Sequence, residues 1–416
     1  MARHCRKTAG PTMATQIPPR KIRRMKTQKS SENTKHETWR ALFDALQRKS
    51  AALLLLLGAT LALAAPLQAG QPAGPGGKRA VDVMQVNLFI GGGIDRVMAL
   101  NPSDPNYLKN LVAAVTGIYY EIVASQPTVR LQGVAQQIAD RMPDFVSVEE
   151  ASLIRIQSPG DLISGGAKPA TNVVFDYLQI LTNALAAQGA HYAVVSTADE
   201  IDVEMPMLNL QTGTIDDVRW NDREAILART DLPPGQLRVT HPQNGNFANV
   251  IQIPGTGITV TRGWCSVDVF LRGRDFRYIC PHLEQETVPQ LQYLQALELL
   301  AGPANTSLPV MIVGDFNADP LGRDGSFAYD LFPAAGFSDA WAVLHPNDLA
   351  DGLTWGHDEY LANPVAQFDR RIDLVFYKGA GFVSTQVSVV DMGLDRTEPP
   401  LWSSDHAAVS AEFQIK

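Results

Sequence analysis

The sequence has few cysteines, no excess of basic residues and no apolar run long enough to cross a membrane. It contains three cysteines, and its 35 Lys and Arg residues are outnumbered by 43 Asp and Glu residues. The longest apolar run, residues 51–65, has about 15 residues, whereas a membrane helix needs about 20. The triple glycine at 91–93 lacks the Lys-Ser or Lys-Thr of a phosphate loop. These features exclude a Walker-type nucleotide site and weaken, without excluding, a polyanionic substrate.

Residues 1–69 are predicted to be a signal peptide with a basic lead-in. They hold 13 basic and only three acidic residues, and the apolar run 51–65 directly follows basic residues. A basic region, a short apolar run and small residues are typical of secretory signals. We expect cleavage after Ala64 or Ala69 and export to the periplasm or the medium, with an uncleaved membrane anchor as the alternative. Without residues 1–69 the net charge changes from −8 to −18.

The remaining chain is predicted to be a flexible linker at 70–80 and one α/β domain at 81–416. No boundary rich in proline or glycine divides the second region, and its strand-like and helical patterns alternate, with hairpins between them. The patterns predict helices at 108–124, 129–140, 171–188 and 288–301. They predict strands at 81–88, 145–148, 191–196, 224–228, 250–260, 264–271, 276–280, 310–314, 371–377 and 407–413.

Cys265 and Cys280 flank a predicted hairpin whose turn is Arg272-Gly273. Pairing Leu271 with Arg274 across that turn places the two cysteines opposite each other. Outside the cytosol such a pair can oxidise to a disulfide. Two buried thiols are the alternative, and neither cysteine has the surroundings of a catalytic one.

Acidic, amide and histidine side chains recur where the predicted strands end. Ligand sites of α/β folds gather at strand ends, so these residues are candidates for one site. They are Asn87, Glu150, His282, Asp315, Asn317, Asp373, Asp405 and His406. Each of them alone has an ordinary explanation as a cap or turn residue, but the ordered set predicts a catalytic centre.

Four of these segments resemble the motifs of the endonuclease/exonuclease/phosphatase superfamily, the relatives of deoxyribonuclease I. They are Pro143–Glu150, Gly314–Asn317, Arg371–Asp373 and Ser404–His406, and the resemblance extends over Val81–Lys416. It implies a four-layer sandwich of two mixed β-sheets flanked by helices. Two departures stand out. The family has Gln where this chain has Glu149, and Asn-Thr-His-Leu where this chain has Cys-Pro-His-Leu at 280–283.

The resemblance implies metal-assisted cleavage of a phosphoester. A hard divalent cation held by carboxylates and water stabilises charge on phosphoryl oxygens. Glu150 is the expected metal ligand, with Asp405 and Asn87 close by or linked through water. Asn87 is also a candidate catalytic residue. Mg²⁺ is the expected cofactor, and Mn²⁺ or Ca²⁺ could substitute for it.

The resemblance also implies a role for each remaining residue. His406 would act as the catalytic base or polarise the phosphate, and Asp373 would hydrogen-bond its ring and fix the tautomer. Asp315 would position the attacking water, Asn317 would orient the phosphate, and His282 would donate to a phosphoryl oxygen.

We expect an exported, monomeric phosphodiesterase acting on nucleic acid, because five arginines could form a basic rim around the site. They are Arg272, Arg274, Arg277, Arg370 and Arg371. A phospholipid phosphodiesterase of the sphingomyelinase or phospholipase C type and a phosphomonoesterase are the alternatives. A non-catalytic binding protein on the same fold would be expected to lose Glu150, Asp315 or His406, and all three are present. Asp222-Arg223-Glu224 is predicted to be a surface turn, with a position facing the substrate as the alternative. Glu149 is predicted to be an acid at the surface or behind the site.

Overall fold

The computed structural model describes residues 80–253, 256–323, 325–390 and 400–416. All of them belong to one compact unit, Ala73–Lys416. The predicted signal peptide and nearly all of the predicted linker lie outside the described residues. Within the described ranges, none of the helices combines the length and the apolar character that a bilayer crossing requires.

The larger sheet has eight strands in the order β15-β16-β1-β2-β6-β3-β4, and β5 pairs with β6 beside this path. β1 runs parallel to β2, whereas β16 and β6 run antiparallel to their neighbours. The sheet is therefore mixed, as expected. Its strands are β1 (Ala80–Asn87), β2 (Phe145–Glu149), β3 (Leu153–Gln157), β4 (Asn172–Asp176), β5 (Tyr192–Leu208), β6 (Ile215–Arg229), β15 (Phe382–Val390) and β16 (Ala408–Ile415).

The smaller sheet has six strands in the order β13-β14-β12-β11-β10-β7. β11 and β12 are parallel and the other neighbours are antiparallel, so this sheet is also mixed. Its strands are β7 (Leu237–Asn246), β10 (Gly263–Leu271), β11 (Arg274–His282), β12 (Val310–Asp315), β13 (Ser338–Asp339) and β14 (Asp373–Lys378). A separate two-stranded hairpin consists of β8 (Ile251–Gln252) and β9 (Thr259–Val260).

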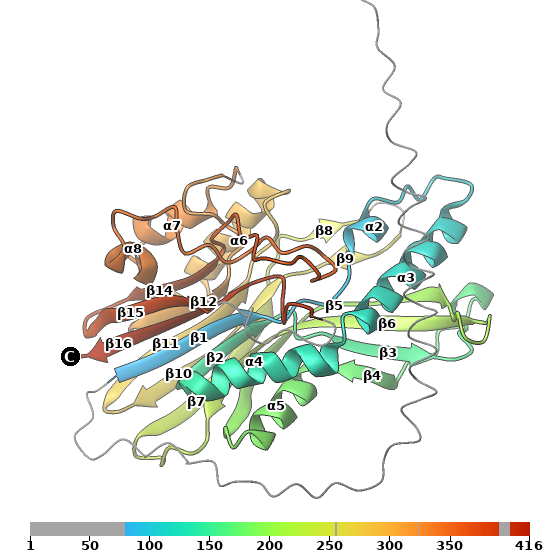
Figure 1. The fold of residues 1–416 in the computed structure, drawn as a ribbon. Helices are drawn as coiled ribbons and strands as arrows, with labels where there is room; N and C mark the ends of the chain where they lie inside the picture. The colour runs from blue at the N-terminus through green and yellow to red at the C-terminus, as the bar shows by residue number, and fades with distance from the viewer. Residues whose placement is uncertain (1–79, 254–255, 324, 391–399) are drawn as a thin grey trace, which may run out of the picture. The chain divides into compact units, whose positions relative to one another are not determined.

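Helices cover the outer face of each sheet (Figure 1). One apolar cluster joins the larger sheet to α4 and α5, and another joins the smaller sheet to α6 and α7. A third fills the space between the sheets, where the Phe145 ring stacks on Tyr278 at a centroid distance of 5.1 Å. This is the expected four-layer sandwich. The helices are α2 (Asp95–Met98), α3 (Tyr107–Ala124), α4 (Pro127–Arg141), α5 (Tyr177–Ala187), α6 (Pro289–Ala301), α7 (Ala328–Ala334) and α8 (Ala340–Leu344), with a 3₁₀ turn at Leu162–Ser164.

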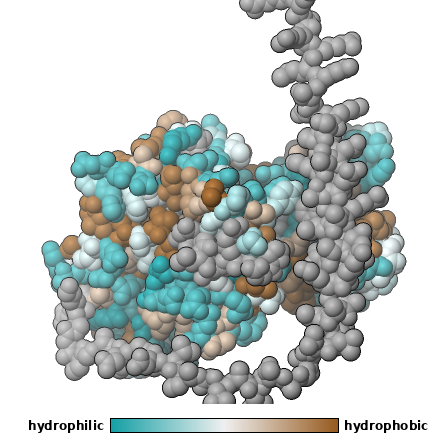
Figure 2. All heavy atoms as spheres, viewed as in Figure 1, coloured by the Kyte–Doolittle hydropathy of each residue, from teal (hydrophilic) through white to brown (hydrophobic). Residues whose placement is uncertain are grey.

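The cysteine hairpin has the predicted register, with Cys265 opposite Cys280 and Leu271 opposite Arg274. Both cysteines are buried free thiols in the structure. The Cys280 Sγ lies 3.2 Å from a carboxylate oxygen of Glu149. On the coloured part of the face drawn in Figure 2, hydrophobic residues form several separate groups among hydrophilic ones.

Three predicted segments differ from the structure. The single strand predicted at 250–260 is the hairpin of β8 and β9. The region 197–222, to which the sequence patterns assign no helix and no strand, belongs largely to the long hairpin of β5 and β6. Register shifts in β5 at Val194–Ser196 and Asp199–Asp202 interrupt the alternation by which a strand is recognised. The predicted helix at 171–188 is strand β4 followed by α5. That helix begins only after Asp176, whose carboxylate caps it by accepting a hydrogen bond from Gln179 N.

Candidate active site

The pairing of the strands brings the predicted site residues to one end of both sheets. Asn87 ends β1 opposite Glu149, the residue before Glu150. His282 ends β11 opposite Asp315, and Asp315 in turn lies opposite Asp373. Parallel neighbours share an end, so residues that are distant in sequence meet here.

His406 is held in a fixed orientation by Asp373. Its Nδ1 lies 2.8 Å from Asp373 Oδ2, and both side chains are buried. Gln85 donates to the other oxygen of the same carboxylate at 2.6 Å. Burial alone would lower the pKa of His406, but the nearby carboxylates of Asp373 and Asp405 outweigh it and hold that pKa well above its usual value. These carboxylates therefore favour the positively charged imidazolium form of His406, whose Nε2 lies 3.9 Å from Asp315 Oδ2.

Asn87 joins two carboxylates of the site. Its Nδ2 donates to Glu150 Oε1 and to Asp315 Oδ2, each at 3.1 Å, and its Oδ1 accepts from the Phe89 amide. The Ile90 amide donates to the second oxygen of Glu150 at 2.9 Å. Asn87 therefore positions the two carboxylates through its Nδ2. That Asn87 is itself a metal ligand stays a prediction, because the Phe89 amide uses one of the two lone pairs of its amide oxygen.

Glu150 and Asp405 provide donors that fit a hard divalent cation. Burial and the negative charge of Glu150 together raise the pKa of Asp405 to about 6, although His406 opposes the shift. A cation between two such carboxylates would offset this repulsion, and carboxylate oxygens are the ligands that Mg²⁺ prefers. Trp355 Nε1 donates to Asp405 Oδ2 at 3.3 Å and helps to fix its direction. Asp315, Asp373 and His406 form a further buried group whose donor atoms lie within 4.8 Å of one another.

His282 faces the same carboxylate oxygen of Asp315 as His406 does. Its Nε2 lies 3.6 Å from Asp315 Oδ2, and its Nδ1 lies 3.0 Å from Arg262 Nη1 and 3.1 Å from Glu224 Oε1. The Arg262 guanidinium can only donate and so favours an accepting Nδ1 with the proton on Nε2, whereas an ionised Glu224 favours the proton on Nδ1. Burial, Arg262 and His406 lower the pKa of His282 well below its usual value, in agreement with a neutral ring. Its Nε2 is directed at Asp315 in the site.

Asn317 and Glu149 lie next to the reacting groups. The Asn317 amide N–H donates to Asp315 Oδ1 at 2.9 Å, and its Nδ2 donates to the Leu283 carbonyl at 3.0 Å. Glu149 is completely buried, accepts from Gln85 at 2.8 Å, and has a pKa well above its usual value, chiefly because of burial. Glu149 is therefore an interior group behind Asp373, and it does not lie at the surface.

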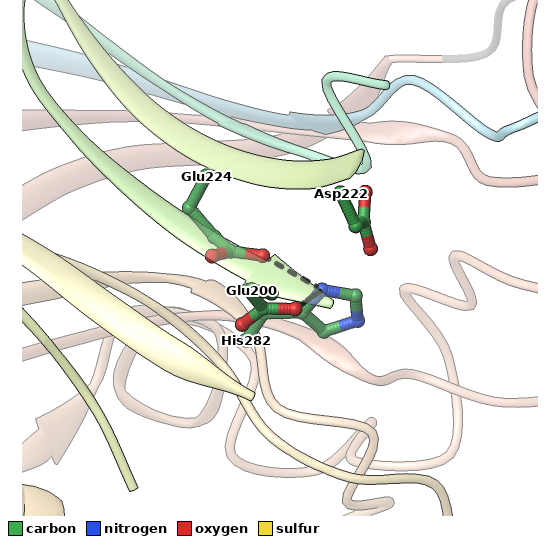
Figure 3. Close-up of side chains that lie close together, drawn as sticks. All are labelled: Glu200, Asp222, Glu224 and His282. Atoms are coloured by element: carbon green, nitrogen blue, oxygen red, sulfur yellow. Dashed lines mark hydrogen bonds and ion pairs between the residues drawn. The ribbon is translucent and has the colours of Figure 1, made fainter. Parts of the chain in front are cut away.

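Behind His282 lies a buried acidic cluster that the sequence analysis missed (Figure 3). Donor atoms of Glu200, Asp222, Glu224 and His282 lie within 4.8 Å of one another. Arg262 Nη1 lies 3.3 Å from Glu200 and 3.6 Å from Asp222, so a guanidinium already offsets part of their charge. Burial raises the pKa of Glu200 to about 7, against the opposing effect of Arg262.

The predicted surface turn at Asp222-Arg223-Glu224 is therefore wrong. The segment lies inside β6, where alternate side chains face the same way and are covered by the second sheet. Asp222 and Glu224, two residues apart, share the buried face, while Arg223 lies on the other and pairs with Asp176 at 2.7 Å. Two acids separated by one residue within a strand were the sequence signal that could have revealed this buried cluster.

The predicted basic rim does not form. In the hairpin of β10 and β11, Arg272 and Arg274 lie at the turn, whereas His282 lies at the opposite end. Arg272 pairs with Asp144 at 2.6 Å, far from the site. Two of the others also pair with acids, Arg277 with Asp268 and the buried Arg371 with Asp339.

Arg370 alone among these arginines lies next to the site. Its guanidinium lies 4.0 Å above the Trp355 ring and pairs with Glu286. One arginine that is already paired does not make a surface for a polyanion.

With this geometry established, comparison with known proteins identifies the family. A family model described as endonuclease/exonuclease/phosphatase matches residues 124–406. The chain belongs to the endonuclease/exonuclease/phosphatase family. Its members are phosphoester hydrolases, and the acidic groups of this chain could bind the divalent metal on which such enzymes depend. No curated protein matches the sequence.

Several solved structures are similar to this member of the family. A family protein from Leptotrichia buccalis has 12% identity and a TM-score of 0.48, over 80% of this chain and all of that one. The mannosyl-6-phosphatase of Bacteroides thetaiotaomicron has 16% identity and a TM-score of 0.46, over 80% of this chain and 100% of that one. The human Nocturnin catalytic domain has 15% identity and a TM-score of 0.44, over 82% of this chain and 96% of that one.

Proposed function

We propose that this family member is a divalent-metal-dependent phosphodiesterase. The observation that carries the proposal is the position of Asp315, whose Oδ2 faces the Nε2 atoms of His406 and His282 at 3.9 and 3.6 Å. A buried carboxylate between one protonated and one neutral imidazole offers both a proton acceptor and donors for phosphoryl oxygens.

Asp315 is the group that we assign to the attacking water. Burial and the charge of Asp373 raise the pKa of Asp315 to about 7, although His406 and Asn87 oppose the shift. A base whose pKa lies near the working pH accepts a proton efficiently. As the water oxygen bonds to phosphorus, one of its protons passes to Asp315. The bond from phosphorus to the leaving oxygen breaks, and the leaving oxygen keeps the bonding electrons and takes a proton from solvent water.

The histidines support the same step by hydrogen bonding. The imidazolium of His406 and the Nε2–H of His282 donate to phosphoryl oxygens, whose negative charge grows as water attacks. Asn317, which hydrogen-bonds to Asp315, adds a further polar group to the site. Glu150 and Asp405 would hold Mg²⁺, with Mn²⁺ or Ca²⁺ as substitutes, and the bound ion would neutralise phosphoryl charge.

The expectation of a nucleic-acid substrate loses its main support because the basic rim does not form. We therefore propose phosphodiester hydrolysis without a preference for nucleic acid, and a panel of substrates tests the choice. DNA, RNA, sphingomyelin, phosphatidylcholine and small phosphomonoesters are incubated with the chain in Mg²⁺ and in EDTA. Activity that persists in EDTA would overturn the metal dependence. Cleavage of monoesters alone would make the protein a phosphomonoesterase.

A matched pair of histidine variants separates the enzyme from a binding protein. His406→Ala is expected to abolish hydrolysis, whereas His191→Ala changes an exposed histidine outside the site and is expected to leave it intact. A His406→Ala protein as active as the parent would favour the non-catalytic alternative.

We also propose that the protein is exported. The support is the sequence of residues 1–69 alone, since that segment lies outside the described residues. Sequencing the N-terminus of the protein recovered from the periplasm or the medium tests this proposal. A protein found only in the cytosol with residues 1–69 intact would refute it.

A further inference from the structure

A large apolar cavity lies beside the proposed active site. It has a volume of about 360 Å³, and its walls come from α2, α3, β3, β5, β6 and the hairpin of β8 and β9. Figure 1 shows α2, α3, β8 and β9 grouped at one end of the larger sheet. Typical walls are Ile118 of α3, Ile154 of β3 and Val218 of β6. Protein interiors are close-packed, so an apolar space of this size has the dimensions of a ligand site.

The small hairpin contributes one apolar face to this cavity. Ile251 pairs with Val260, and the Ile253 amide donates to the Ile258 carbonyl at 2.9 Å. All four of these side chains line the cavity and are only half-buried. Their spacing of two residues along each strand directs them the same way. Four large apolar side chains that face an unfilled space are unfavourable unless something apolar covers them. A ligand in the cavity would complete their packing.

The cavity meets the proposed active site at two points. Arg262 lines it and contacts His282 Nδ1 at 3.0 Å. Ile90 lines it as well, and its amide donates to the predicted metal ligand Glu150 at 2.9 Å. The cavity is therefore one residue removed from His282, on the Nδ1 side of its ring, and one residue removed from Glu150.

We propose that this cavity holds the alkyl or acyl chain of the substrate, so that the substrate class is a lipid phosphoester. This inference rests on the proposed phosphodiesterase function. The polar residues where the cavity meets the site include the acids Asp222 and Glu284, which disfavour a second phosphate group. A polynucleotide carries one phosphate per nucleotide and offers no long apolar segment for such a wall. A single phosphoester attached to an apolar chain would place its phosphate in the proposed active site and its chain in the apolar cavity.

The test is a homologous series of p-nitrophenyl alkyl phosphodiesters, from methyl to decyl, assayed with Mg²⁺ below their micellar concentrations. Burial of each added methylene is expected to raise kcat/KM about three- to fourfold until the cavity is full. Ile258→Trp places an indole in the cavity and is expected to reduce this gain to less than twofold per methylene. Val97→Trp, on α2, also places an indole in the cavity and is expected to reduce the gain equally. Either variant alone is enough for the test if the other fails to fold.

The control is Ile163→Trp, which makes the same change at an exposed isoleucine outside the cavity. It is expected to keep the dependence on chain length of the parent. A parent whose kcat/KM is the same for methyl and decyl esters would overturn the lipid inference and leave the phosphodiesterase proposal intact. If no ester, including methyl, is hydrolysed with any divalent metal, the proposed function itself fails.

Discussion

His406 and Asp373 lie 33 positions apart in the chain, and their side chains meet at 2.8 Å inside the protein. The carboxylate fixes the imidazole and raises its pKa, so Asp373 and His406 act as one unit. Asp373→Asn keeps the shape but removes the charge. It is expected to lower kcat by on the order of 10²–10⁴ with little change in KM. Steady-state kinetics on the most active substrate of the panel measures both constants.

The same pair makes a prediction about additivity. Residues that act as a unit give non-additive losses, so the double variant His406→Ala with Asp373→Asn is expected to be no less active than His406→Ala alone. Asp348→Asn, at an exposed aspartate, serves as the control and should match the parent. Losses that simply multiply would mean that the two residues contribute independently.

Glu150 offers a test of the metal site that does not depend on activity. Glu150→Gln removes the carboxylate charge but keeps the hydrogen-bonding shape beside Asn87 and Ile90. The affinity for Mg²⁺ or Mn²⁺, measured by titration calorimetry, is expected to fall at least tenfold. Glu412→Gln, on β16, provides a matched control. Equal affinities in parent and Glu150→Gln would place the metal elsewhere.

The residues of the proposed site could be singled out from sequence because each one lies in a short motif at a strand end. Parallel pairing of β1 with β2 and of β11 with β12 then brings those ends together. Glu200 could not be found in this way. It lies within a register shift of β5, where the regular alternation fails, and it meets Glu224 only through the pairing of β5 with β6.

The basic rim failed for a related reason. Nearness of arginines in sequence says nothing about which end of a hairpin they occupy, and Arg272 and Arg274 occupy the end away from His282. The apolar cavity was also beyond sequence analysis. Its walls come from six separate elements, and an apolar residue facing a cavity has the same pattern as one packed in a core.

Arg262 is expected to be essential for stability because it is buried among acids. It lies near Glu200, Asp222 and Glu284, and all four side chains are almost inaccessible to solvent. Arg262→Met would leave the acids without their cation, and an uncompensated buried charge costs about 3–5 kcal/mol. Urea unfolding at pH 7.5 measures the loss.

Arg219→Met is the matched control for Arg262→Met, because Arg219 pairs with Asp202 on a partly exposed part of β5 and β6. Surface pairs contribute less than about 1 kcal/mol. Similar losses in the two variants would show that burial of Arg262 has no special importance.

Asp82 gives a prediction for the dependence of stability on pH. Burial and the charges of Asp144 and Glu412 raise the pKa of Asp82 from 3.8 to about 6, although Arg272 opposes the shift. The folded protein therefore binds this proton more tightly than the unfolded chain does. Ionised Asp82 opposes folding, and its cost is absent below the unfolded pKa of 3.8, grows as the pH rises towards 6 and is complete above that.

Asp82→Asn removes this cost at high pH and changes nothing at low pH. Because Asp82 is only partly buried, the free energy of unfolding is expected to rise by on the order of 1 kcal/mol at pH 7.5. At a pH near 3.5 the variant and the parent should be equally stable. Urea unfolding at both pH values measures the difference, with the exposed Asp275→Asn as control. A gain of the same size at both pH values would show that the effect does not come from the charge of Asp82.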